Sequence, residues 1–163
     1  MDERALLRLT THPITTWWIR HVASHIDPWL FRASNGRFFS MGVPSQPMLT
    51  LTTTGRRSGR RRSVHLACIE HDGDHLVVAS AMGQRKHPAW RYNLEANPEV
   101  EVQLRGRRFP ARARPLDDAE KAALWPEIKR AIPQLEVYEQ RTQRNIQIFR
   151  LRATGTFFAN LRC

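Results

Sequence analysis

A short segment rich in arginine carries the strongest chemical signal in this sequence. Five arginines lie within residues 56–62, Gly55 and Gly59 stand beside them, and three threonines occupy positions 52–54. Guanidinium groups and the exposed backbone N–H groups of a tight turn both bind phosphate and carboxylate. The Gly-Lys-Ser/Thr ending and the following helix of a P-loop are missing. The segment therefore predicts either an anion-binding turn or a basic hairpin that only faces solvent.

A second group of candidate residues begins at Ala79-Ser80 and continues at residues 87–93, which read His-Pro-Ala-Trp-Arg-Tyr-Asn. The first turn of a helix offers free N–H groups and the positive end of the helix dipole, and both attract anions. Trp90 in that helix can stack on a flat ring, although a tryptophan in a short helix more often packs in the core. The residues alone leave both interpretations open.

Tyr138 is the remaining candidate for proton chemistry. It is one of only two tyrosines, and its hydroxyl can either donate a proton to a bound substrate or simply face water. The seven histidines show no zinc spacing, since His21 and His25 have no third ligand spaced with them. A GxSxG nucleophile elbow is also missing. We therefore expect neither a metal site nor a hydrolase.

Alternating strand and turn signals surround these residues. The predicted strands are Met48–Thr53, Ser63–Glu70, Leu76–Ser80, Val100–Leu104, Arg107–Arg114 and Ile146–Ala153. Helices are predicted at Pro88–Asn97, Asp117–Ile132 and Gln134–Arg141, after an N-terminal amphipathic helix. Most strands are joined by short turns, which implies antiparallel pairing. The expected fold class is therefore α+β, with a barrel or a strongly coiled sheet and peripheral helices.

Composition indicates a globular protein with an anionic partner. The 163 residues are 41% hydrophobic, and the net charge is +11 with only three lysines among the 26 basic residues. We divide the chain into a helical segment, 1–41, and a barrel domain, 42–163. The two cysteines, Cys68 and Cys163, indicate no disulfide framework, so a reducing cytoplasm is expected. Nucleic acid is not the expected partner, because no known recognition pattern is present.

Residues 48–97 match a known family in order and spacing. They contain Leu-Thr-Thr-Thr-Gly-Arg-Arg-Ser-Gly, then Asp-Gly-Asp-His-Leu-Val-Val-Ala-Ser, then His-Pro-Ala-Trp and Asn-Leu-Glu-Ala-Asn-Pro-Glu-Val. This combination resembles the deazaflavin-dependent nitroreductase family, and the similarity extends from about residue 17 to residue 152. The resemblance implies a split β-barrel like that of flavin-mononucleotide-binding oxidoreductases. It also implies coenzyme F420, a 5-deazaflavin with a phosphodiester and a polyglutamate tail.

The resemblance also assigns residues to the site. Ser80 and Tyr138 match positions implicated in substrate placement, and they become the candidate catalytic residues. The cofactor-binding positions implied by the family are Arg56, Arg57, Ser58, Gly59, Arg62, Ser63, Val64, His65, Leu66, Val78, Ala79, Ser80, Ala89, Trp90, Arg91, Tyr92 and Asn93.

The implied reaction is hydride transfer from the reduced deazaflavin to a small electrophile, which can be a quinone, an activated alkene or a nitroaromatic. Family members known for nitroreductase activity carry lysine, tyrosine and a further aromatic residue at the positions of Ala81, Ala67 and Leu135. These three departures alter the expected substrate pocket and count against reduction of bicyclic nitroimidazoles. Two alternatives are a non-catalytic module that binds an anionic ligand, either F420 or nucleic acid, and a flavin enzyme on the same barrel.

The predicted N-terminal helix has an aromatic face with basic flanks. The aromatic and aliphatic residues are Trp17, Trp18, Trp29, Leu30 and Phe31, and the flanking residues are Arg20, His21, Arg32 and Arg37. Tryptophan favours the headgroup zone of a bilayer and basic residues are drawn to anionic lipid, so this face predicts peripheral attachment to the inner face of the cell membrane. Packing of the same face on the barrel, or on a second subunit in a homodimer, is the alternative.

Overall fold

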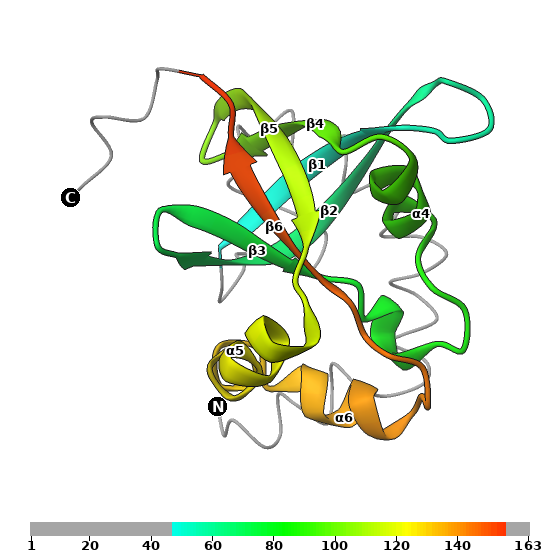
Figure 1. Cartoon of the computed structure of the whole chain (residues 1–163), viewed down its shortest axis with the longest axis vertical. Coiled ribbons are helices and arrows are strands. Elements are labelled where there is room, and N and C mark those ends of the chain that lie inside the picture. Colours follow the sequence, from blue (N-terminus) through cyan, green and yellow to red (C-terminus); the bar gives the residue numbers. More distant parts are fainter. Residues whose placement is uncertain (1–46, 156–163) are drawn as a thin grey trace.

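The computed structural model in Figure 1 describes residues 47–155 of the chain. The predicted N-terminal helix and the predicted domain boundary at residue 42 lie outside these residues and stay predictions.

Six strands of the described part form one closed antiparallel barrel in the order β1-β2-β3-β6-β5-β4. Their bounds are β1 Met48–Thr54, β2 Arg61–His71, β3 Asp74–Val78, β4 Glu99–Leu104, β5 Arg107–Pro115 and β6 Ile148–Ala153. All six predicted strands are present, and the α+β split-barrel class is confirmed. The last strand begins two residues later than expected, and β3 ends before Ala79 and Ser80.

Two tight hairpin turns join consecutive strands of the barrel. Asp72-Gly73 joins β2 to β3 and Arg105-Gly106 joins β4 to β5, and all four residues have positive φ angles between 49° and 78°. Two-residue hairpins require this conformation at both positions, because it matches the right-handed twist of the strands. A glycine at the second position adopts it without steric cost.

Four helical segments within residues 47–155 accompany the barrel. They are the 3-10 turn η2 Ala81–Gly83, α4 Ala89–Ala96, α5 Asp118–Ala131 and α6 Gln134–Gln140. The first turn of α5 is closed by a capping box in which the side chains of Asp117 and Glu120 accept each other's backbone N–H. Pro126 lies inside α5 without ending it. None of the helices in residues 47–155 is long and apolar enough to cross a membrane.

Two hydrophobic clusters stabilise the barrel and its contact with the helices. The first fills the barrel interior and includes Leu49, Val102 and Phe149, all with at most 1% of their surface exposed. The second includes Leu76, Ile128 and Leu135 and joins the outer side of β3 to α5 and α6. Figure 1 shows the consequence: α5 and α6 lie together on one side of the barrel, and α4 lies beside the tip of the β1–β2 hairpin.

Candidate functional site

A cleft of about 610 Å³ lies where the β1–β2 turn and the start of β2 meet α4. Its lining residues are Gly55, Arg56, Arg57, Ser58, Arg62, Ser63, Val64, Ala89, Trp90, Tyr92 and Asn93. All of them except Gly55 belong to the cofactor-binding set that the family resemblance implied. The structure therefore joins the arginine-rich turn and the His-Pro-Ala-Trp helix, two motifs separated by about thirty residues, into one concave site.

The two glycines of the arginine-rich turn have different roles. The N–H of Gly55 donates to the carbonyl of Arg60 at 2.8 Å, and a Cβ on Gly55 would lie 2.9 Å from the Ser58 hydroxyl oxygen. Gly59 has a φ of +63°, a left-handed conformation that side chains rarely adopt. Gly55 thus permits the close approach of the chain to Ser58 and Arg60, and Gly59 permits the left-handed backbone conformation of the turn. The arginines lie on the outside of this compact turn.

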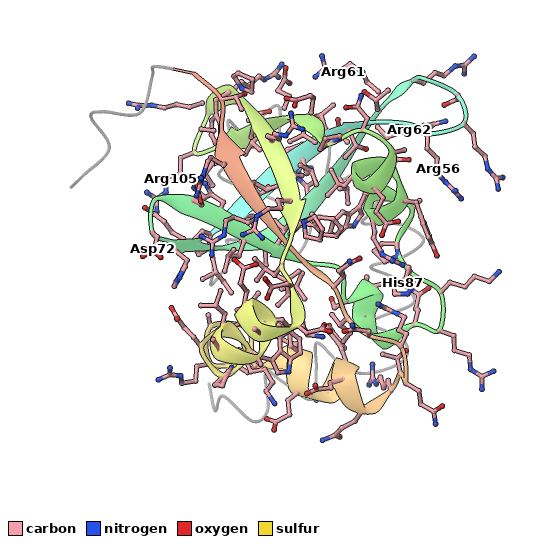
Figure 2. The ribbon with its side chains drawn as sticks, in the orientation of Figure 1. Arg56, Arg61, Arg62, Asp72, His87 and Arg105 are labelled. Carbon is pink, nitrogen blue, oxygen red and sulfur yellow. The ribbon has the colours of Figure 1, made fainter. Side chains whose placement is uncertain are left out.

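The arginines of this turn divide into paired and unpaired groups. Arg61 forms an ion pair with Glu101 at 3.1 Å, and its guanidinium is therefore neutralised. Within residues 47–155, no carboxylate pairs with Arg56, Arg57, Arg60 or Arg62, and all four are exposed. Figure 2 shows Arg56 and Arg62 on the α4 side of the hairpin, with Arg61 apart from them. The cleft therefore has a rim of uncompensated positive charge.

Asn93 connects the arginine-rich turn to α4. Its side chain is buried; Nδ2 donates to Thr53 Oγ1 at 3.0 Å, and Oδ1 accepts the Arg56 N–H at 3.1 Å. Buried amide groups strongly favour being hydrogen-bonded, so this one holds the two walls of the cleft at a set separation.

The aromatic residues of α4 complete the cleft wall. Trp90 lines the cleft, yet it is only 8% exposed and packs against the edge of Phe149 in the barrel core. The two interpretations of Trp90 are therefore compatible. Tyr92 lies under the guanidinium of Arg56, 4.8 Å from the ring centre, a distance at which a cation and an aromatic face attract each other.

Ser80 and Tyr138, the candidate catalytic residues, do not line this cleft. Ser80 is half-buried directly after β3, and Tyr138 is half-buried on α6 against the second hydrophobic cluster. Gly83 brings the two elements together: a Cβ there would lie 2.8 Å from the carbonyl oxygen of Tyr138. Burial raises the pKa of Tyr138, so its hydroxyl keeps its proton at neutral pH.

Several other residues that were expected to bind the cofactor instead pack in the core or bond to neighbouring elements. Ala79 is fully buried in the barrel core, and Val78 packs in the second cluster beneath α5 and α6. His65 interacts across the β1–β2 pair with the hydroxyl of Thr50 at 3.0 Å, and Leu66 packs against the barrel core. Arg91 is tied to Gln147 at 2.6 Å. Gly59, like these five residues, is outside the cleft lining.

Arg144 is a contact centre that sequence reasoning missed. Its guanidinium donates to the carbonyl oxygens of Ala79 and Gln84, both at 2.9 Å, and to that of Ser80. A further contact at 3.1 Å joins it to Nδ1 of His87. No sequence signal could have identified this residue, because three of its four partners are backbone carbonyls that lie 60–65 positions earlier in the chain.

Comparisons with known proteins agree with this geometry. The family model described as F420H(2)-dependent quinone reductase matches residues 23–152. An F420H(2)-dependent quinone reductase of Mycobacterium tuberculosis is 33% identical over 142 residues, which cover 83% of this chain and 95% of the relative. A solved F420-H2 dependent reductase is 37% identical, with a TM-score of 0.60, over 65% of this chain and 94% of its own. A second solved structure, titled a domain-swapped dimer, is 32% identical with a TM-score of 0.62, over 84% and 98% of the two chains. The chain therefore belongs to the F420H(2)-dependent quinone reductase family, which confirms the F420-dependent oxidoreductase expected from its sequence.

Proposed function

We propose that this protein binds reduced coenzyme F420 in the cleft between the arginine-rich turn and α4 and uses it to reduce a quinone. The observation that carries the proposal is the group of exposed arginines without carboxylate partners in the described residues, three of which line the cleft, in a chain that belongs to an F420H(2)-dependent family. A cofactor with a phosphodiester and an acidic tail supplies the negative charge that these arginines lack.

The residues present fit such a cofactor. The cleft volume of about 610 Å³ is within the usual range for cofactor sites, and Trp90 and Val64 provide apolar surface for a ring system. Arg56, Arg57 and Arg62 would hold the phosphodiester and the tail. When bound, the reduced deazaflavin supplies a hydride rather than single electrons, and that chemistry belongs to the cofactor.

The protein contributes positioning and a proton on the acceptor side. We assign this role to Ser80 and Tyr138, whose elements are packed together at Gly83. Reduction of a quinone carbonyl develops negative charge on oxygen, and preorganised hydroxyl donors stabilise such charge. Burial raises the pKa of the Tyr138 hydroxyl, so the group stays protonated at neutral pH and can donate a hydrogen bond to the developing negative charge.

Activated alkenes and nitroaromatics remain candidate acceptors beside quinones. The three positions at which the chain departs from nitroreductases differ in exposure and backbone conformation. Ala67 is half-buried in β2 and packs against the second cluster, and Ala81 begins η2 with a φ of +46°. Leu135 is 1% exposed within the second cluster, so its side chain supports α6. We expect Ala67 and Ala81 to influence acceptor choice more than Leu135 does.

The proposal is tested by titrating the purified protein with F420, its reduced form and flavin mononucleotide, followed by turnover with menadione. We expect binding of the deazaflavin alone and oxidation of the reduced form only when quinone is present. Tight binding without turnover on any acceptor would identify a cofactor carrier. Preferential binding of flavin mononucleotide would reject the cofactor assignment.

We also propose two assembly properties that the described residues leave untested. The aromatic and basic residues of segment 1–41 support attachment to an anionic membrane surface, where lipid-soluble quinones reside. The relative whose structure is titled a domain-swapped dimer supports a homodimer.

A further inference from the structure

Arg144 contacts both ends of the segment that connects the barrel to α4. Two of its acceptors, the carbonyls of Ala79 and Ser80, directly follow β3. The other two, the Gln84 carbonyl and His87 Nδ1, lie just before α4. Four contacts from one planar guanidinium set the separation of the two ends, because its N–H groups point in fixed directions.

Gln147 strengthens the same anchor from the chain segment before β6. Its backbone carbonyl accepts the Ala79 N–H at 2.8 Å, and its side-chain oxygen accepts from Nε of Arg91 on α4 at 2.6 Å. The peptide groups on both sides of Ala79 are therefore held by residues 144–147. Within residues 144–147, Arg144 is the residue that bonds to the carbonyl of Ser80.

The anchored segment has an unfavourable backbone conformation. Ala81, Met82 and Gly83 have φ angles of +46°, +54° and +75°, so three consecutive residues occupy the left-handed region. For residues other than glycine this conformation is costly, and it persists only where surrounding contacts enforce it. Removing the contacts of Arg144 should therefore release the segment to other conformations.

We infer that Arg144 is a positioning residue that holds the segment 79–87 in the conformation that presents Ser80 beside α6, and thereby governs turnover of the acceptor. Arg144 is not among the residues that line the arginine-rich cleft. The inference rests on the proposed function, because it assigns the acceptor to the side of Ser80 and Tyr138.

The first measurement uses the protein without cofactor. Hydrogen–deuterium exchange is compared for the wild type, Arg144→Lys, Arg144→Ala and a control, Arg130→Gln, at an exposed arginine on α5. A lysine keeps the positive charge, but its compact ammonium group cannot reach all four acceptors. We expect the amides of Gly83 and Gln84, which bond to Ser80 and Ala81, to exchange at least about tenfold faster in both Arg144 variants. Exchange in the barrel strands should not change.

The second measurement separates cofactor binding from turnover. We expect both Arg144 variants to bind F420 within about twofold of the wild type while kcat with menadione falls by about tenfold or more, because only the acceptor side is disturbed. Arg130→Gln should match the wild type in both respects.

The inference is overturned if Arg144→Lys keeps wild-type exchange in residues 79–87 or wild-type kcat. It is also overturned if that variant loses exchange protection throughout the barrel, since Arg144 would then serve general stability. If Arg144→Ala does not fold, the lysine variant decides alone. Failure of the wild type to oxidise reduced F420 would reject the proposed function, and the exchange data would still decide whether Arg144 holds the segment.

Discussion

Arginines in the described part of this protein differ in their partners. Several on β5 and β6 form ion pairs with carboxylates, as do Arg112 with Glu99 and Arg114 with Glu120, whereas Arg107 and Arg108 on β5 are exposed. Arg152 similarly bonds to the buried Asp74. The exposed arginines of the β1–β2 turn have no carboxylate partner in the described part of the chain. The arginines of the described residues thus include surface ion pairs and an exposed group at the cleft, which we propose binds the cofactor.

The rim predicts how cofactor affinity responds to loss of charge. We expect the double variant Arg56→Ala/Arg57→Ala to lose about 1.5–3 kcal/mol of F420 binding free energy for each charged hydrogen bond removed. The matched control is Arg107→Ala/Arg108→Ala, an exposed adjacent pair on β5 that changes the net charge equally. Fluorescence titration with long-tailed F420, repeated at increasing salt, measures the effect. Equal affinities for the two double variants would reject the rim as the tail site.

The proposed role of Tyr138 predicts that its loss lowers the turnover rate without changing the affinity for F420. We expect Tyr138→Phe to lower the rate with menadione and to leave F420 affinity within about twofold, since a proton donor acts mainly in the transition state. Steady-state rates and an equilibrium titration of the same preparation provide both values. A variant as fast as the wild type on every acceptor would remove Tyr138 from the mechanism.

His87 predicts a dependence of stability on pH. Burial, and then the guanidinium groups of Arg91 and Arg144, lower its pKa below the ordinary histidine value, while Glu95 acts in the opposite direction. Because the folded state favours the neutral ring, this contribution is complete above the ordinary histidine pKa. It is lost as the pH falls from there through the lowered folded-state value.

We therefore expect the unfolding temperature to fall between about pH 7 and pH 5, and to fall less in His87→Asn, whose amide oxygen can accept from Arg144 in place of Nδ1. Some pH dependence should remain, because burial also lowers the pKa of His75. Thermal unfolding in buffers of matched ionic strength measures both proteins. Identical pH profiles would show that His87 does not contribute.

At the scale of elements, the cleft depends on how α4 is attached to the β1–β2 turn. Asn93 makes that attachment through Thr53 and the backbone N–H of Arg56. We expect Asn93→Ala to destabilise the protein by about 1–3 kcal/mol, because it leaves buried partners unsatisfied, and to weaken F420 binding as the walls separate. Urea unfolding and a cofactor titration measure the two effects.

Asn97→Ala is the matched control for this variant. Asn97 is half-buried at the end of the same helix, and its side chain accepts a solvent-exposed hydrogen bond from the N–H of Glu99. We expect it to change stability much less and cofactor affinity not at all. A larger loss of F420 affinity in the control than in Asn93→Ala would contradict the proposed role of Asn93 in holding α4 to the β1–β2 turn.

For the whole molecule, the proposed attachment of segment 1–41 to an anionic membrane surface makes a direct prediction. We expect the full chain to co-sediment with anionic vesicles more than with neutral ones, and a version without the residues before Gly42 to lose that binding. Circular dichroism of the shortened chain checks that it remains folded. If the full chain stays in the supernatant with both lipids, segment 1–41 serves packing and the membrane proposal fails.

The helices and strands of residues 47–155 could be predicted from local sequence patterns, and so could the candidate cofactor-binding motifs. Strand alternation is a local property: Phe109, Ala111 and Ala113 face the core while Pro110, Arg112 and Arg114 face water. The turns are equally local, because Asp72-Gly73 and Arg105-Gly106 adopt the positive φ angles that close a hairpin. The arginine-rich turn and the tryptophan helix could likewise be identified by type and spacing, and the family match agrees with them.

Which of these residues contact one another could not be predicted from the sequence and follows from the folded barrel. It placed Gly55 in the cleft lining and Gly59 outside it, and it turned Val78 toward the helices. It also separated Ser80 and Tyr138 from the arginine-rich cleft and joined their elements at Gly83. Arg144 shows the physical reason most clearly, since backbone carbonyls are identical in every residue and carry no sequence signal. Contacts of that kind are set by how the closed barrel brings distant segments together.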